Sequence, residues 1–215
     1  MIDATRLESD LLLLYPDAGP ELNFTTDYEL LVAVILSAQC TDVRVNIITE
    51  ELFAVADTPQ KMCELGEGRI AQIIHSCGMY RQKAKALYNG AKILLDEYDG
   101  IVPDTREELM RLPGVGRKTA NVVLSNAFGM PAIAVDTHVS RLAFRLGLSD
   151  EKDPFKIELD LQKVFPMSSW TKMHHLLILH GRRVCTARSP KCQDCSLKSY
   201  CPRKGLAHVS DKKSL

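Results

Sequence analysis

The sequence predicts an all-α protein, and three observations carry that prediction. Apolar residues recur at helical spacing, as Leu7, Leu11 and Leu14 do near the N-terminus. Two segments begin with a Thr-x-x-Glu capping box, in which the two side chains satisfy free N–H groups at a helix start. No Asn-Gly or Asp-Gly pair joins two alternating segments, so β-hairpins are not expected.

The expected helices follow the chain in order. The box at 26–29 opens the apolar run Leu30–Ala38. Periodicity alone would allow a buried strand there, but the cap and the alanine content favour a helix. The second box begins a short helix expected from Thr105 to Leu112. Residues 171–181 are expected to form a further helix that ends at Gly181.

The segment Leu112–Lys118, with the sequence LPGVGRK, is expected to be the turn of a helix–hairpin–helix. Gly114 and Gly116 permit a tight turn and let the backbone approach a ligand. The helix that follows would offer its free N–H groups and the positive end of its dipole to a phosphate. The alternative is an ordinary glycine turn between two core helices, but the helices on both sides and the basic Arg117-Lys118 pair favour phosphate binding.

Lys118 and Asp136 are the candidate catalytic pair. Lys118 falls in the first turn of a helix, where the helix dipole disfavours the ammonium form and leaves more free amine for a Schiff base. Its alternative role is simple pairing with phosphate. Asp136, in the segment AVDTH, could hold the lysine, shuttle protons or stabilise an oxocarbenium-like sugar. Its alternative role is a helix N-cap, and both roles are compatible.

Four of the seven cysteines form a C-x6-C-x2-C-x5-C pattern that predicts a metal site: Cys185, Cys192, Cys195 and Cys201. The spacing leaves the metal open, since zinc usually takes two close cysteine pairs and an iron–sulfur cluster tolerates uneven spacing. Arg188 and Lys191 lie between the first two of these cysteines. They are expected either to face DNA phosphates or to neutralise an anionic thiolate cluster.

Composition restricts the class of protein further. The formal net charge is zero, but acidic residues are in excess in the first half and basic residues in the second. No apolar run approaches the roughly 20 residues that a membrane-spanning helix needs. We expect a cytoplasmic, nucleoid-associated protein, in which cysteines are reduced thiols or metal ligands rather than disulfides.

Taken together, LPGVGRKTANVVL, VDTHV and the cysteine pattern resemble the endonuclease III family of DNA glycosylases. The resemblance spans most of the chain and implies two helical domains. One is a six-helix barrel over residues 22–133, with the helix–hairpin–helix near 105–128. The other is a non-contiguous iron–sulfur domain over 1–21 and 134–215. It holds a four-iron four-sulfur ([4Fe-4S]) cluster on the four cysteines.

The resemblance also implies an activity and its residues. The family removes oxidised pyrimidines in base-excision repair and cuts the strand by β-elimination, with a lysine Schiff base as intermediate. Lys118 matches the Schiff-base lysine, and Asp136 matches the catalytic aspartate. The expected partner is double-stranded DNA that contains a damaged base or an abasic site, bound by a monomer.

The expected DNA contacts are also carried over by position. Gln39 matches the residue that fills the hole left by the flipped nucleotide, and Met79 matches the apolar wedge on the other strand. Gly114 and Gly116 would present N–H groups to phosphate, with a monovalent cation as a further expected ligand of the hairpin.

Three positions depart from the family pattern. Met79 stands where Leu or Ile is common, Met130 where an aromatic is found, and Cys40 where a small residue is expected.

A mismatch-specific adenine or uracil/thymine glycosylase is one alternative. The adenine-removing relatives carry a catalytic Glu where this chain has Ile35, and they lack a lysine at position 118. A non-catalytic DNA-binding iron–sulfur module is the other alternative.

Overall fold

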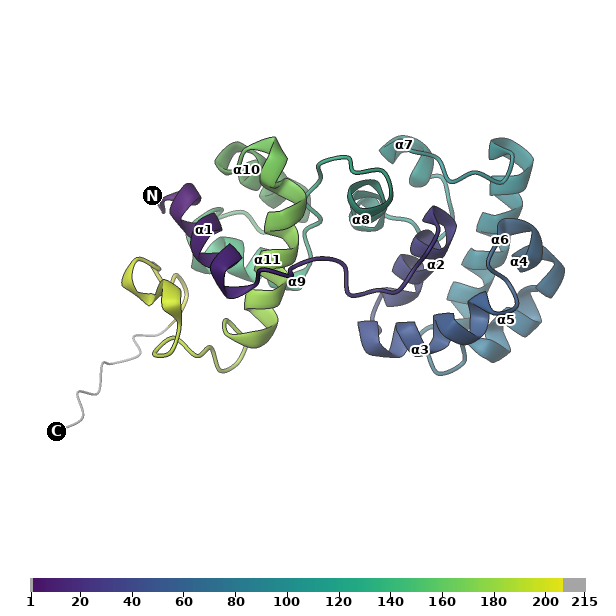
Figure 1. Ribbon diagram of the computed structural model, residues 1–215, viewed down its shortest axis with the longest axis horizontal. Helices are drawn as coiled ribbons and strands as arrows, with labels where there is room; N and C mark the ends of the chain where they lie inside the picture. Colours follow the sequence, from purple (N-terminus) through teal and green to yellow (C-terminus); the bar gives the residue numbers. More distant parts are fainter. Residues whose placement is uncertain (1, 207–215) are drawn as a thin grey trace. The chain divides into compact units, whose positions relative to one another are not determined.

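The computed structural model describes residues 2–206, and its internal contacts divide the chain into two compact units. The split unit joins Met1–Gly19 to Pro131–Leu215, and the continuous unit is Pro20–Met130. Every regular element in the described residues is helical (Figure 1). The predicted all-α class is therefore confirmed.

The continuous unit is built around two helices that carry most of its core. Helix α2 is buried from Tyr28 to Leu36 because it packs against α3, α6 and α8. This burial on all sides explains its unbroken apolar run. The long helix α6 also packs against α4 and α5, which lie beside it in Figure 1. The helices of this unit are α2 (Asp27–Ser37), α3 (Asp42–Phe53), α4 (Pro59–Leu65), α5 (Glu67–Ile73), α6 (Tyr80–Tyr98), α7 (Arg106–Leu109) and α8 (Arg117–Ala127).

The split unit brings the N-terminal helix onto the C-terminal half of the chain. Helix α11 packs against α1 and α9, while α10 packs on α9. Leu7 and Leu11, on the face of α1 that the spacing predicts, are fully buried in this core. The helices of this unit are α1 (Ala4–Leu14), α9 (Thr137–Arg145), α10 (Pro154–Val164) and α11 (Trp170–Arg183), with the short 3-10 turns η1 (Met167–Ser169) and η2 (Ser196–Ser199).

The first predicted capping box begins α2, with one difference in its partners. The Thr26 hydroxyl accepts a hydrogen bond from the Glu29 N–H at 3.1 Å, as a capping box requires. The Glu29 carboxylate reaches one residue further back and accepts from the Thr25 N–H at 2.6 Å. Both acceptors still satisfy N–H groups at the start of the helix.

Two helix ends differ from the expectation. Helix α7 ends at Leu109 rather than Leu112, and the chain continues in i to i−3 hydrogen bonds that include Leu112 N–H to Leu109 C=O. The proline after Leu112 disfavours helical backbone there. Helix α11 continues past Gly181 to Arg183. Gly181 is a close-packing residue instead, since a Cβ there would lie 3.1 Å from the Cβ of His138 on α9.

Candidate functional site

The predicted hairpin lies between α7 and α8 in the continuous unit. A hydrogen bond of 3.1 Å from the Val115 N–H to the Leu112 carbonyl closes the turn. Gly116 is the N-cap of α8 and has no side chain to cap the helix. No side chain caps the start of α8, as the phosphate-binding prediction requires.

The two hairpin glycines are needed for different reasons. Gly114 has a φ of +81°, and a Cβ there would lie 3.2 Å from the Ala86 Cβ and 3.4 Å from Ile35 Cγ2. It is thus fixed by its own backbone and by packing against α6 and α2. Gly116 has extended backbone, and a Cβ there would meet nothing within 4 Å. Gly116 is the position where the turn leaves room for a ligand to approach the backbone.

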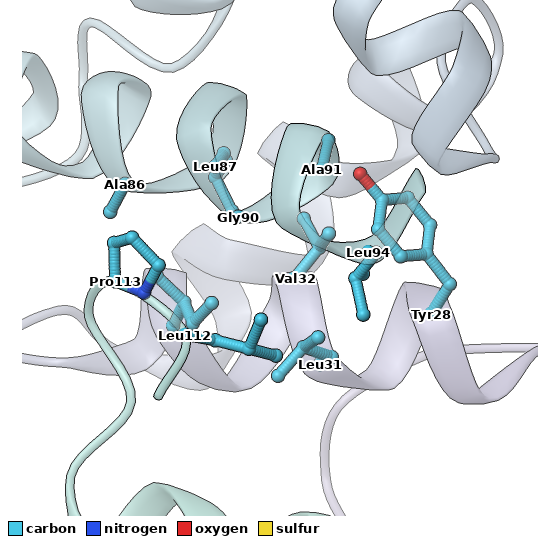
Figure 2. A pocket seen from close by; sticks show the side chains of 11 residues that line it. Tyr28, Leu31, Val32, Ala86, Leu87, Gly90, Ala91, Leu94, Leu112 and Pro113 are labelled. Atoms are coloured by element: carbon cyan, nitrogen blue, oxygen red, sulfur yellow. The ribbon is translucent and has the colours of Figure 1, made fainter. Parts of the chain in front are cut away.

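The hairpin rests on a narrow apolar pocket between α2 and α6. Figure 2 shows Pro113 beside Ala86 and Gly90 of α6, with Tyr28 at the other end of the pocket. The space between its lining atoms, including the part open to solvent, is about 240 Å³. The buried Tyr28 hydroxyl has no hydrogen-bond partner within residues 2–206, and burial raises its pKa.

The two candidate catalytic residues each begin a helix. Lys118 is the second residue of α8, as expected, and its side chain is exposed. Asp136 is the N-cap of α9, where its carboxylate accepts a hydrogen bond of 2.8 Å from the Val139 N–H. The N-cap role weighed for Asp136 is confirmed. One carboxylate oxygen is thereby fixed, and the half-buried side chain keeps a second oxygen for other partners.

Gln39 and Met79 share an unusual backbone conformation. Both are non-glycine residues with positive φ, 54° for Gln39 and 59° for Met79. Such residues are uncommon and concentrate at functional sites. Both side chains are exposed, Met79 to 50%. Periodicity and capping patterns gave no indication of this conformation, since neither residue type favours it.

The four cysteine thiols of the predicted metal site line one cavity of the split unit. Apolar side chains such as Leu142, Leu146 and Leu197 line the rest of this cavity. The space between its lining atoms, including the part open to solvent, is about 350 Å³. Burial raises the pKa of Cys195 and of Cys201, and the other thiols of the group raise it further. Holding all four sulfurs as thiolates would need a positively charged group between them.

The arrangement of these thiols favours a cluster over a single ion. Within residues 2–206, no three His, Cys, Asp or Glu side chains have the close arrangement that a single metal ion needs. An iron–sulfur cluster holds its thiolates farther apart, because each thiolate binds a different iron. Four cysteine thiols that line one cavity are a ligand set that fits a [4Fe-4S] cluster.

The basic loop between the first two cysteines is held by an arginine that sequence analysis missed. Arg145 is buried on α9 and donates hydrogen bonds to the carbonyls of Thr186 at 2.7 Å and Ala187 at 3.0 Å. Arg188 and Lys191 on this loop are exposed, as DNA contacts need to be. A cation on the apolar face of α9, next to Leu146, is the sequence feature that could have indicated Arg145.

The two other departures from the family pattern lie at unremarkable positions. Cys40 is half-buried, and burial is the main cause that raises the pKa of its thiol. The interpretation of Cys40 as an inert small side chain is the one this environment favours. Met130 is partly exposed, at 40%.

None of the helices in residues 2–206 combines the length and hydrophobicity that crossing a membrane requires.

Comparison with known proteins places these features in a family. Residues 32–167 match the model of the HhH-GPD superfamily of base excision DNA repair proteins. Residues 185–201 match the iron–sulfur binding domain of endonuclease III. The chain is 50% identical to endonuclease III of Rickettsia conorii over 86% of its own length and 89% of the relative. It is 47% identical to endonuclease III of Escherichia coli K12, covering 88% and 90%.

Solved structures agree with the sequence relatives. A trapped endonuclease III–DNA covalent intermediate superposes with a TM-score of 0.89 at 43% identity, covering 94% of this chain and 97% of that one. A thermostable thymine-DNA glycosylase superposes with a TM-score of 0.82 at 24% identity, which shows a shared fold.

Proposed function

Because the chain belongs to the endonuclease III family of base-excision DNA repair enzymes, we propose that Lys118 and Asp136 carry its chemistry. The enzyme is a DNA glycosylase with an associated abasic-site lyase activity, and it acts on oxidised pyrimidines in duplex DNA. The observation that carries the assignment of Lys118 is its exposed amine at the start of α8, directly after a phosphate-binding hairpin. The relative trapped as a covalent intermediate with DNA supports a covalent mechanism.

The proposed reaction has two steps. The damaged nucleotide leaves the base stack, since its C1′ is out of reach inside a duplex. The free amine of Lys118 attacks C1′, and the base departs with the bonding electrons as the C1′–N bond breaks. Asp136 stabilises the positive charge that develops on the sugar and moves protons between the lysine and the sugar. The C1′–O4′ bond then breaks as a proton moves from the lysine nitrogen to O4′, so the sugar ring opens and a C1′=N imine forms. The imine acidifies the C2′ proton, and its loss expels the 3′ phosphate and cuts the strand.

The remaining site residues serve binding. Gln39 fills the hole left by the flipped nucleotide, and Met79 props the duplex open on the other strand. The N–H groups at Gly114 and Gly116 bind backbone phosphate without reading sequence. A monovalent cation at this turn stays a prediction. Basic side chains of the loop around Arg188, with Lys191, add phosphate contacts on the split unit.

The [4Fe-4S] cluster would be held by Cys185, Cys192, Cys195 and Cys201. When bound it supplies four metal–thiolate links that fix the loop between the first two cysteines. The chain's own part is to surround these ligands with apolar side chains and to hold the loop through Arg145. Glycosidic cleavage transfers no electrons, so the proposed role of the cluster is structural.

The domain assignment belongs to the same proposal. Residues 22–133 form the barrel domain, and 1–21 with 134–215 form the iron–sulfur domain. The division of contacts after Gly19 and after Met130 supports these bounds. We further infer a cytoplasmic, nucleoid-associated protein that works as a monomer. Sedimentation of the protein alone and with a short duplex measures whether it is a monomer.

Borohydride trapping tests the catalytic assignment. Wild-type holoenzyme is incubated with a duplex that contains one thymine glycol, and Lys118→Gln is run beside it. A covalent protein–DNA band is expected for the wild type and not for Lys118→Gln. Lys92→Gln, an exposed lysine on α6, is the matched control and should trap as the wild type does.

Two other results would change the assignment. A band that depends on Lys118 with an abasic site but not with thymine glycol would keep the lyase and reopen the choice of base, including mismatched uracil or thymine. No band with either substrate would reject the lysine mechanism and favour a monofunctional glycosylase or a binding module.

A further inference from the structure

Lys83 is a buried cation in the continuous unit. Its side chain is on α6 and only 4% of the residue is exposed. The amino group donates hydrogen bonds to the carbonyls of Ala38 at 2.6 Å and Leu36 at 2.8 Å, and to the Cys77 sulfur at 3.0 Å. These three acceptors match the three N–H donors of a lysine ammonium.

The position of this amino group relative to α2 explains why it can be buried. Burying a charge is costly unless its hydrogen bonds are made. Leu36 lies in the last turn of α2, and Ala38 is its C-cap residue. The carbonyl groups at a helix C-terminus lack helical partners and carry the negative end of the dipole, so a cation is favoured there. Lys83 therefore supplies donors that α2 needs at its end.

The carbonyls that Lys83 binds belong to the segment that carries Gln39. We call residues 37–40 the Gln39 segment and residues 76–79 the Met79 segment. A Cβ on Gly78 would lie 3.3 Å from the Gln39 carbonyl oxygen, so the two segments are in close contact. Each carries an exposed side chain on left-handed backbone, Gln39 on one and Met79 on the other. Such backbone persists only where the surroundings hold it.

Lys83 contacts both segments at once. Its side chain binds the Ala38 carbonyl in the Gln39 segment and the Cys77 sulfur in the Met79 segment. Its backbone N–H binds the Met79 carbonyl at 3.1 Å, in the first turn of α6. The Cys77 thiol in turn donates to the Leu36 carbonyl at 3.3 Å. One residue thus fixes the distance between two loops that share no helix.

We propose that Lys83 is a positioning residue that locks the Gln39 and Met79 segments together, so that both side chains enter the DNA as one preformed unit. The inference rests on the proposed function, which assigns these two side chains to the opened duplex. A preformed pair has less conformational freedom to lose when the nucleotide is extruded. Lys83 itself touches neither the sugar nor the base.

Lys83→Met tests the proposal, because methionine keeps a long side chain and removes all three donors. The Leu36 and Ala38 carbonyls then lose their donor, and the Gln39 segment is free to leave its left-handed backbone. Under single-turnover conditions, excision from a thymine glycol duplex should slow by about tenfold or more. β-Elimination at a preformed abasic site should change far less, because a nucleotide without a base costs least to extrude.

A second readout follows the opening of the duplex directly. 2-Aminopurine placed opposite the lesion gains fluorescence when it loses its stacking. Wild-type enzyme should give a fast rise on binding, and Lys83→Met should give a slower or smaller one. A role in stability alone would lower Tm and leave both the ratio of the two reaction rates and this rise unchanged.

Two further variants keep the test decisive. Lys92→Met removes an exposed lysine from the same helix and should behave as wild type in every assay. Gly78→Ala presses a Cβ against the Gln39 carbonyl from the other side and leaves Lys83 in place. It should slow excision selectively in the same way, which covers the case in which Lys83→Met does not fold.

The outcomes separate this inference from the function on which it rests. If wild-type enzyme neither excises thymine glycol nor traps on an abasic site, the proposed function fails. If wild type is active and Lys83→Met keeps its excision rate, the positioning role is wrong. The same conclusion follows if Lys83→Met does not fold and Gly78→Ala excises at the wild-type rate, or if excision and β-elimination fall equally.

Discussion

Substituting the two hairpin glycines one at a time should separate an effect on protein stability from an effect on DNA affinity. Gly114→Ala places a methyl group 3.2 Å from Ala86 Cβ on a backbone with a φ of +81°. Left-handed backbone costs an L-residue roughly 1–2 kcal/mol, and overpacking a close contact costs about 1–3 kcal/mol. The free energy of unfolding should therefore fall by about 2–5 kcal/mol, and the turn should be distorted.

Gly116→Ser is the matched change in the same turn. Its backbone is extended, with φ −96° and ψ 178°, and a Cβ added there meets nothing in the protein within 4 Å. Serine is also a good helix N-cap, so the free energy of unfolding should stay the same or rise slightly. The side chain instead occupies the space through which phosphate would approach the N–H groups. Losing one hydrogen bond to a charged group costs about 1.5–3 kcal/mol, roughly a 10- to 100-fold loss of affinity.

The assays are urea unfolding of the holoenzyme by circular dichroism and fluorescence anisotropy with a duplex that carries a stable abasic-site analogue. The loss of affinity in Gly116→Ser should be uniform across sequences, because phosphate contacts carry no sequence information. Wild-type affinity in Gly116→Ser would refute phosphate binding at this turn. Wild-type stability in Gly114→Ala would refute the packing argument for Gly114.

Two further predictions concern stability alone. Tyr28→Phe removes a buried hydroxyl that has no partner in the described residues, so the free energy of unfolding should rise by about 1 kcal/mol. A lower Tm would show that the hydroxyl is hydrogen-bonded in solution. Burial lowers the pKa of His175 from 6.5 to about 4, with Lys172 adding to the shift. Folding thus favours the neutral ring, and the stabilisation is complete above pH 6.5 and is lost as the pH falls toward 4. His175→Gln should remove up to about 3 kcal/mol of this pH dependence. Urea unfolding at a series of pH values checks this, and parallel curves for variant and wild type would contradict it.

Local sequence patterns predict the parts of the fold that depend on local interactions. The capping threonine Thr26, the helical spacing along α1 and the hydrogen bond that closes the hairpin turn all involve residues a few positions apart. Helix α7 ends at Leu109 and not at the predicted Leu112. Pro113 disfavours helical backbone at Leu112, and the residues before it form a tighter turn. Gly181 was assigned to a helix end because its real constraint, the approach of His138, lies 43 positions away in the sequence.

The resemblance to the family predicts the site residues, but it does not predict the contacts that hold these residues in place. The left-handed backbone of Gln39 and Met79 depends on contacts between segments about 40 residues apart. No propensity favours that conformation for either residue. Arg145 likewise acts on carbonyls of Thr186 and Ala187 that are far along the chain. Lys83 and Arg145 are both basic residues on the apolar face of a helix, which is a feature that the sequence shows. The carbonyls that accept their hydrogen bonds are known only from the folded chain.

Lys83 and Arg145 have the same role in their two units, because each donates hydrogen bonds to carbonyls of an irregular segment. Irregular segments present exposed side chains well, but their partly buried carbonyls need donors that a helix or sheet would otherwise supply. In each unit a cation from a neighbouring helix provides those donors, to Ala38 beside Gln39 and to Ala187 beside Arg188. Cations used in this way cannot bind phosphate. Counting basic residues therefore overestimates the DNA-binding charge, and the salt dependence of DNA affinity should follow the exposed cations alone.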